Sequence, residues 1–183
     1  SKSSQYFHAL KMQANEKNNI TPMIIMTPKS LLRHPFAASP IKEFTETEFS
    51  KTIAYLPKNT DKITTLVMCS GKMIVDLLDK NKEPININNA IISIEELYPF
   101  PSKDIEGFLR KNKNINKIIW IQEEPKNRGA WHFVSNQIHN SSIMKEYELE
   151  YYGSTERAST SVGTSELHKI QIESIKNKFN EIK

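Results

Sequence analysis

The sequence predicts an α/β protein whose open, mostly parallel five-stranded sheet carries helices on both faces. Four short runs are apolar throughout, as strands buried on both faces are, and they lie at residues 23–27, 63–69, 89–94 and 117–122. Longer segments between these runs repeat apolar residues at helical spacing. This alternation favours parallel strands that are joined by helical crossovers.

The first part of the chain is expected to hold one helix, one strand and little other regular structure. Residues 3–17 place aromatic and aliphatic side chains at the spacing of a helical stripe. The run MIIMT at 23–27 is the first predicted strand. One helical turn is expected over 28–32, because proline is favoured at the first helical position. Residues 33–60 are predicted to be mostly irregular, since prolines interrupt them.

The rest of the chain is predicted to alternate strands and helices. Helices are expected over residues 70–81, 102–112, 129–140 and 164–183. Ser70 and Ser102 are predicted as the N-caps of the first two of these helices. The fifth strand, 146–152, alternates apolar and polar residues as a half-buried or edge strand does.

Composition and charge restrict the classes of function. The 183 residues suit one domain with a small appendage, and the net charge of +4 is spread along the chain, which argues against a nucleic-acid partner. The single cysteine, Cys69, cannot form an intrachain disulfide and favours a reducing compartment. Apolar runs fall short of the roughly 20 residues of a membrane span, and the histidines lack metal-ligand spacing. We therefore expect a soluble intracellular protein without a metal site in this chain.

Basic residues follow two of the predicted strands at the end where ligands collect in open α/β sheets. Ser70 and Lys72 flank a glycine between strand and helix, where free backbone N–H groups suit an anion; an ordinary turn is the alternative. Lys29 and Arg33 lie four residues apart and share a face if their segment is helical. That pair suits a phosphate, or else ordinary surface ion pairing.

Two adjacent acids follow the fourth strand in QEEPKNRGAW, residues 122–131. Paired carboxylates can serve acid–base catalysis. Adjacent residues that leave a strand point in opposite directions, however, so Glu123 and Glu124 would not face one bond. We expect one of them to pair or cap locally and the other to be solvated. The sequence shows no nucleophile with its base, and we assign no catalytic residue.

Several stretches together resemble one enzyme family. MTPKSLLRHPFA (26–37), MCSGK (68–72), IEELYPFP (94–101) and QEEPKNRGAW (122–131) occur in the order and spacing of the C-terminal region of 2-oxoglutarate dehydrogenase E1 components. These are thiamine-diphosphate-dependent decarboxylases. The resemblance covers the whole chain. The related 2-oxoadipate dehydrogenase E1 components share the motifs and stay open as an alternative.

The resemblance implies a transketolase C-terminal-like domain over residues 21–183, preceded at 1–20 by the end of a pyrimidine-binding domain. It implies that the whole enzyme binds thiamine diphosphate and Mg²⁺, decarboxylates 2-oxoglutarate and transfers the succinyl group to lipoyl-E2 in the tricarboxylic acid cycle. A homodimer that works with E2 succinyltransferase and E3, in the bacterial cytoplasm or the mitochondrial matrix, is implied as well. The cofactor-activating glutamate and the metal ligands lie upstream in the family. This chain would therefore support the dimer without a cofactor of its own.

The family also raises the possibility of regulation, because some members carry an effector site for acetyl-CoA or a nucleotide in this domain. The strand-end groups would suit its phosphates, and Arg128, where the family usually has an uncharged residue, would add a charge: the candidate residues are Lys29, Arg33, Ser70, Lys72 and Arg128. Ser154 and Thr155 stand where the family often has arginine, so an effector site that needed those arginines would be lost. A regulatory acetyl-CoA or nucleotide module, and a self-contained interaction domain, stay open as alternatives to the E1 reading.

Overall fold

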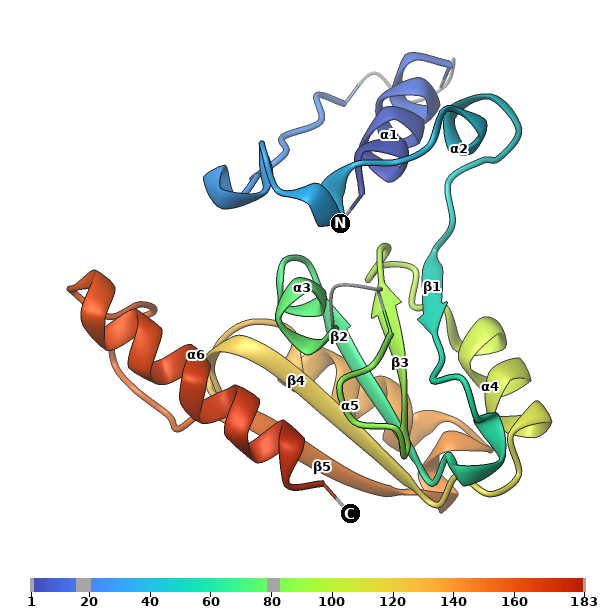
Figure 1. The fold of residues 1–183 in the computed structure, drawn as a ribbon, viewed down its shortest axis with the longest axis vertical. Coiled ribbons are helices and arrows are strands. Elements are labelled where there is room, and N and C mark those ends of the chain that lie inside the picture. Colours follow the sequence, from blue (N-terminus) through green and yellow to red (C-terminus); the bar gives the residue numbers. More distant parts are fainter. Residues whose placement is uncertain (1, 16–20, 79–82, 183) are drawn as a thin grey trace. The chain divides into compact units, whose positions relative to one another are not determined.

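The computed structural model describes residues 2–15, 21–78 and 83–182, and the chain divides into two compact units, Ser1–Lys51 and Thr52–Lys183. The first unit holds two helices and two single 3-10 turns (Figure 1), which are α1 (Ser3–Asn15), η1 (Lys29–Leu31), η2 (Pro35–Ala37) and α2 (Ile41–Thr45). This unit extends past residue 20, where the sequence led us to expect a domain boundary. That boundary stays a prediction for the whole protein.

Helix α1 packs on α2 through its polar face. Ser4 Oγ donates a hydrogen bond to Glu43 Oε2 at 2.8 Å, and His8 Nε2 lies 2.7 Å from the Glu43 carbonyl oxygen. Both Ser4 and His8 are buried, whereas Tyr6 and Phe7 on the apolar stripe are 47% and 42% exposed. The helix predicted at this place is therefore present, and buried polar contacts hold it to the unit together with an edge-on contact between Phe7 and Phe44, whose ring centroids are 5.6 Å apart.

The strand predicted at 23–27 is absent, so this prediction is wrong. Residues 21–28 form neither helix nor strand, and Ile24 and Met26 are 84% and 89% exposed. Apolar and β-branched residues favour a strand only where a neighbouring strand satisfies the backbone, and no described residue pairs with this run. The fifth strand is instead β1 (Thr52–Tyr55), inside the stretch that was predicted to be mostly irregular.

The second unit is built on one sheet with the strand order β1-β3-β2-β4-β5 (Figure 1). The remaining strands are β2 (Thr65–Ser70), β3 (Asn89–Ile94), β4 (Lys117–Pro125) and β5 (Glu148–Ser154). The β3–β2, β2–β4 and β4–β5 pairs are parallel, and β1 pairs antiparallel with β3. The predicted mostly parallel five-stranded sheet is confirmed, with β5 as an edge strand.

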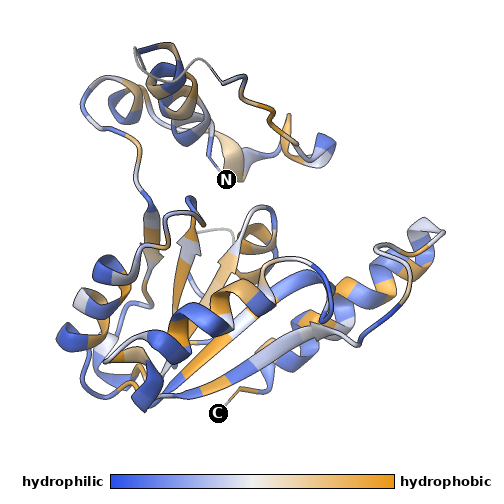
Figure 2. Ribbon diagram, turned by 180° about the vertical axis from the view of Figure 1, so that it is seen from behind, coloured by the Kyte–Doolittle hydropathy of each residue, from blue (hydrophilic) through white to orange (hydrophobic). Residues whose placement is uncertain are grey.

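Helices cover both faces of the sheet, which confirms the predicted fold class. Figure 1 shows α3 (Met73–Leu77) and α6 (Ser165–Asn180) in front of the sheet, and the reverse view in Figure 2 shows α5 (Trp131–Asn140) on the other face. Helix α4 (Ser102–Lys111) shares a buried cluster with α5. Short turns η3 (Thr60–Lys62) and η4 (Met144–Glu146) complete the unit. Among the described residues, no helix is long and apolar enough to cross a membrane.

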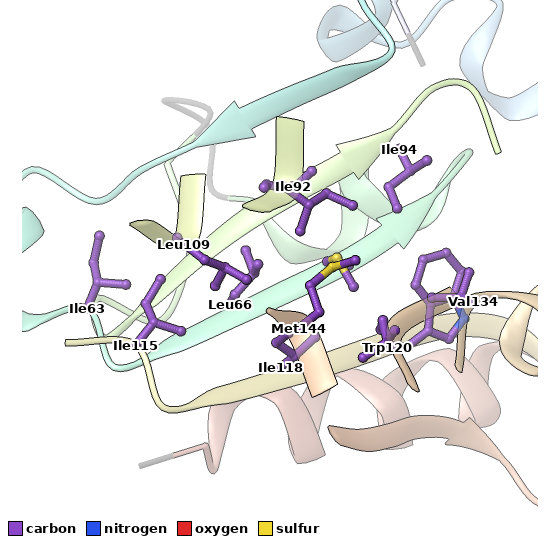
Figure 3. Close-up of a cluster of buried hydrophobic side chains, with 14 residues drawn as sticks. Ile63, Leu66, Ile92, Ile94, Leu109, Ile115, Ile118, Trp120, Val134 and Met144 are labelled. Atoms are coloured by element: carbon purple, nitrogen blue, oxygen red, sulfur yellow. The ribbon is translucent and has the colours of Figure 1, made fainter. Parts of the chain in front are cut away.

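The core explains why the strands are apolar at every position. Alternate residues of β2, such as Leu66 and Met68, join Trp120 of β4 in the cluster under α4 and α5 (Figure 3). The intervening residues Val67 and Cys69 are also fully buried, because successive side chains point to opposite faces and both faces are covered. Burying one such side chain contributes roughly 1.5–3 kcal/mol.

The helix predicted at 70–81 starts later than expected. Strand β2 continues through Ser70, and Gly71, with a φ of 63°, makes the turn, so α3 begins only at Met73. Ser70 is therefore not an N-cap, which corrects the prediction. The helix also ends earlier than predicted, at Leu77, because Leu78 is extended and forms an isolated β-bridge with Pro84. Residues 79–81 of the prediction lie outside the described part of the chain.

The other predicted helices are present with small shifts at their ends. Pro101, not Ser102, holds the N-cap position of α4, and its side chain makes no capping hydrogen bond. The serine prediction failed because the backbone becomes helical one residue earlier than expected. At α6, Thr164 Oγ1 does accept a hydrogen bond from the Leu167 N–H.

Candidate functional site

The carboxyl ends of β2 and β4 separate and leave a cleft between them. The two strands pair from Thr65 opposite Lys117 to Met68 opposite Trp120 and no further. Beyond that point β2 stays beside β3, while β4 follows β5. The cleft has a volume of about 400 Å³ and is lined by Ser70, Leu97, Tyr98, Glu124, Gly129, Ala130 and Phe133.

This cleft lies where the chain reverses its direction of travel across the sheet. From β2 the chain moves to β3 on one side, and from β3 it crosses to β4 on the other side of β2. The helices that make these connections cover opposite faces, so the loops beyond β2 and β4 diverge. Open α/β sheets bind ligands at this topological switch point. We call the space the switch-point cleft.

The buried side chain of Gln122 organises the wall of the cleft that β4 and α5 form. Its Oε1 accepts hydrogen bonds from Trp120 Nε1 at 2.8 Å and from the Trp131 N–H at 3.0 Å. Its Nε2 donates to the carbonyl oxygens of Arg128 at 2.7 Å and Pro125 at 3.2 Å. The side chain is 3% exposed. One amide therefore ties the strand, the turn and the start of the helix together.

Gly129 lets the turn close around this amide. Its φ is +65°, a conformation that L side chains rarely adopt. A Cβ at this position would lie 2.9 Å from Gln122 Nε2. The glycine therefore serves both the backbone conformation and the close approach of the amide.

Tyr151 of β5 braces the same turn from outside. Its hydroxyl lies 3.0 Å from the carbonyl oxygens of Glu124 and Ser154, and its ring centroid lies 5.1 Å from that of Trp131. Burial raises the pKa of the Tyr151 hydroxyl to about 12, so the group stays a hydrogen-bond donor at neutral pH.

A network of alternating charges lies on the other side of β4. Lys72 Nζ is 2.9 Å from Asp76 Oδ2 and 3.1 Å from Glu123 Oε1, and Lys176 Nζ of α6 is 2.8 Å from Asp76 Oδ1. Although burial favours the neutral form of Lys72, the hydrogen bond to Asp76 and the charge of Glu123 outweigh it and raise the pKa of the ammonium. The network thus joins α3, β4 and α6.

Glu123 and Glu124 point to different surroundings, as the strand geometry predicted. Glu123 pairs with Lys72, and its carbonyl oxygen accepts a hydrogen bond from Gln171 Nε2 of α6 at 2.8 Å. Glu124 lines the switch-point cleft with Phe133 of α5. The two carboxylates therefore cannot act as a pair on one bond, and the interpretation that one of them pairs locally is confirmed.

Asp76→Asn should lower the free energy of unfolding by about 1–2 kcal/mol at neutral pH, because Lys176 loses its carboxylate partner. Although burial opposes its charge, hydrogen bonds from Lys176 and Lys72 lower the pKa of Asp76 below the ordinary 3.8. A lowered folded pKa gives stability that is present above pH 3.8 and is lost as pH falls through the folded value. The gap between parent and variant should therefore shrink in acid.

Urea denaturation at pH 7, 5 and 3 measures this gap. Asp61→Asn is the matched control, because Asp61 lies on the exposed turn η3 and forms no ion pair with any described residue. It should change stability by less than about 0.5 kcal/mol at each pH. A gap for Asp76→Asn that stays constant from pH 7 to pH 3 would contradict the assignment.

A family model described as 2-oxoglutarate dehydrogenase C-terminal matches residues 38–179. The chain belongs to this 2-oxoglutarate dehydrogenase C-terminal family. The match includes the whole second unit except its last four residues, and so contains the switch-point cleft and the charge network. The resemblance drawn from the sequence motifs is confirmed.

Curated relatives of this family member are bacterial 2-oxoglutarate dehydrogenase E1 components. The chain is 41% identical over 176 residues to that of Exiguobacterium sp. strain AT1b, and 37% identical over 180 residues to that of Geobacillus sp. strain WCH70. It is 37% identical over 172 residues to that of Staphylococcus aureus strain JH9. These alignments cover 92%, 96% and 93% of the chain but only 18%, 19% and 18% of the relatives. The chain thus spans less than a fifth of their length.

The predicted effector residues of this 2-oxoglutarate dehydrogenase domain fall in different settings. Lys29 and Arg33 lie in the first unit, on η1 and just after it. In the second unit Ser70 lines the switch-point cleft, whereas the Lys72 ammonium is already bound by two carboxylates and Arg128 is exposed on the turn. An anion near Lys72 would therefore compete with Asp76 and Glu123.

The described part of this domain does not provide the ligands that the Mg²⁺ of thiamine diphosphate requires. Mg²⁺ prefers several oxygen ligands in near-octahedral geometry. In residues 2–15, 21–78 and 83–182, no three His, Cys, Asp or Glu side chains are grouped so that they could hold a metal ion. These residues therefore do not fit the metal site of the cofactor.

Gln122 is the organising residue that sequence reasoning missed. The available signal was a polar residue that continues a strand buried on both faces. Buried polar groups are almost always hydrogen-bonded, so such a residue indicates a specific local network. Its partners could not be read from the sequence, because Trp120 precedes it on the strand while Arg128 and Trp131 belong to the turn and the next helix.

Proposed function

We propose that this chain is the C-terminal region of the E1 component of a 2-oxoglutarate dehydrogenase complex. The observation that supports this most directly is 41% identity over 92% of the chain to an E1 component. The whole protein would bind thiamine diphosphate and Mg²⁺ upstream of this region. It would decarboxylate 2-oxoglutarate and transfer the succinyl group to lipoyl-E2.

The role we propose for the region itself is architectural. Its polar groups at the strand ends are used in internal bonds: Gln122 holds the turn, and Lys72 joins two carboxylates. Such a rigid domain suits support of a homodimer that works with E2 succinyltransferase and E3. We propose the cytoplasm of a bacterium rather than a mitochondrial matrix as its location, and the support for this is that the three relatives are bacterial proteins.

Expression of the complete coding sequence tests the proposed activity. With thiamine diphosphate and Mg²⁺, the purified protein should reduce ferricyanide at the expense of 2-oxoglutarate. The rate should exceed that with 2-oxoadipate by about tenfold or more, since one extra methylene is worth about that much in a fitted pocket. Faster turnover of 2-oxoadipate would assign the alternative E1 class, and turnover of only pyruvate or a sugar phosphate would refute both.

An effector site at Lys29, Arg33, Ser70, Lys72 and Arg128 stays a proposal. The support for it is the basic residues that follow β2 and β4, which are Lys72 and Arg128. The carboxylates around Lys72 weaken that support, and Lys29 and Arg33 follow no strand in the structure. Titration calorimetry of the whole dimer with acetyl-CoA and AMP, repeated on Arg33→Ala and Lys72→Ala, tests it. Absence of binding, or binding that both substitutions leave unchanged, would count against the site.

A further inference from the structure

The switch-point cleft carries one charged side chain among the residues that line it. This is Glu124, and the other polar side-chain groups in the lining are the hydroxyls of Ser70 and Tyr98. The other lining side chains are Leu97, Tyr98, Ala130 and Phe133, which are aliphatic or aromatic. The lining therefore offers hydrogen-bond acceptors and apolar surface, but no cation.

The charge of Glu124 is not neutralised within the part of the chain that the structure describes. No described cation lies within ion-pair distance of its carboxylate. Among the basic residues of the adjoining loops, Lys72 is bound to Asp76 and Glu123, and Lys126 Nζ lies 5.8 Å from the centre of the Tyr151 ring. Arg128, next to the lining residue Gly129, is exposed on the turn and forms no ion pair with any described residue. Glu124 lines the cleft and is also exposed to solvent, so its carboxylate is a charge that a cation can reach and that salt screens.

Aromatic side chains stand at the same opening. Tyr98 is 82% exposed, which is unusual for so large a side chain, and its ring centroid lies 6.5 Å from that of Phe133. Phe100 supports Phe133 from behind, with ring centroids 6.1 Å apart. Faces of aromatic rings attract ammonium and guanidinium groups within about 6 Å, by about 0.5–2 kcal/mol. The rings and the carboxylate thus favour the same class of ligand.

We propose that the switch-point cleft binds a primary ammonium or guanidinium group on a short apolar stem. The cation hydrogen-bonds to the Glu124 carboxylate and the Ser70 hydroxyl, and the stem packs on Leu97 and Phe133. A free alkylamine and a lysine or arginine side chain of a protein segment share this chemistry. The inference does not depend on the proposed enzymatic function, and it gives the cleft the opposite preference in charge from a phosphate effector.

Three isosteric probes test the preference in charge on the isotopically labelled 183-residue chain. We expect n-butylammonium to shift the backbone amide resonances of Ser70, Leu97 and Ala130 in a saturable way. Butyrate should shift them at least about tenfold more weakly at equal concentration, and n-butanol should fall between, because one unit of charge changes sign next to Glu124. Raising the salt concentration from 20 to 500 mM should weaken the binding of n-butylammonium but not that of the other two probes, because salt screens the attraction between the charges.

Two substitutions one residue apart locate the site. Glu124→Gln keeps the shape of the cleft and should lower the affinity for n-butylammonium about fivefold to tenfold. Glu123→Gln is the matched control, because it changes the net charge equally but acts on the far side of β4; it should leave the affinity within about twofold. Tyr98→Ala, at an exposed position, should weaken binding about threefold without unfolding the chain.

A blocked Leu-Lys-Leu peptide distinguishes the two sources of the cation. Tighter binding of the peptide than of n-butylammonium assigns the cleft to a protein segment, and equal or weaker binding assigns it to a small amine; either result supports the proposal. Butyrate or AMP shifting the same resonances as strongly as n-butylammonium would overturn it. Loss of binding in Glu123→Gln but not in Glu124→Gln, or the absence of any saturable shift, would overturn it as well.

Discussion

Gln122→Leu should lower the free energy of unfolding of the second unit by about 3–5 kcal/mol. Leucine has a similar volume, so the change removes hydrogen bonds rather than packing. The indole N–H of Trp120 and the backbone N–H of Trp131 lose their acceptor, and the Arg128 carbonyl loses its donor. Each buried group left without a partner costs about 1–3 kcal/mol. Urea denaturation followed by tryptophan fluorescence measures the loss, because both tryptophans of the chain flank Gln122.

Gln137→Leu on α5 is the control for this substitution. The Gln137 side chain has no hydrogen bond to any described residue, so the same change of side chain should cost less than about 0.5 kcal/mol. The Gln122 variant should also expose the turn, which predicts faster amide exchange at residues 126–131. Equal stability of the two variants would show that the Gln122 contacts do not hold the turn.

Gly129→Ala should destabilise the same unit by about 2–4 kcal/mol, for two separate reasons. The φ of +65° costs a residue with a Cβ about 1–2 kcal/mol. The added Cβ would also lie 2.9 Å from Gln122 Nε2, and that amide cannot move without losing its partners. Thermal and urea denaturation both measure the effect, and Trp131 fluorescence reports on the turn directly.

Gly107→Ala is the control for this substitution, because it adds the same methyl group where neither the backbone conformation nor a neighbouring atom opposes it. Gly107 lies inside α4, and a Cβ there would meet no atom within 4 Å. Alanine is favoured over glycine in a helix by about 0.5–1 kcal/mol, so this variant should be more stable than the parent. In the double variant Gly129→Ala with Gln122→Ala, the clash with the amide is absent. Its loss of unfolding free energy should therefore be smaller than the sum of the losses in the two single variants. Full additivity would show that the amide is not the obstacle.

These two residues also show how far sequence reasoning reaches. QEEPKNRGAW was interpreted as a connection between strand and helix, because the apolar run, the proline and the glycine are local signals. This is right for residues 126–130, but β4 continues past the predicted end at residue 122 to Pro125. The divergence of Glu123 and Glu124 followed from the alternation of side chains along a strand. The role of Gln122 did not follow, since its partners lie on three elements and are brought together only when β4, the turn and α5 pack.

The charge at the strand ends was harder to predict for a related reason. Ser70 and Lys72 were expected to favour an anion because they would lie between the end of a strand and the start of a helix, where backbone N–H groups are free. In the structure β2 continues through Ser70, and Lys72 turns toward Asp76 and Glu123. Glu123 is 51 residues away in the sequence, so no local pattern reports its approach.

The sequence by itself determined the order of strands and helices from β2 to α6 and the family motifs. It could do so because apolar runs and helical spacing are local properties of the chain. Only the tertiary structure decided that MIIMT forms no strand here while β1 does, since a strand exists only where a neighbour satisfies its backbone. It also decided that the switch-point cleft presents a carboxylate and not an ammonium. The sign of the charge that a site presents depends on which side chains, distant in the sequence, neutralise one another. Packing decides which of them meet.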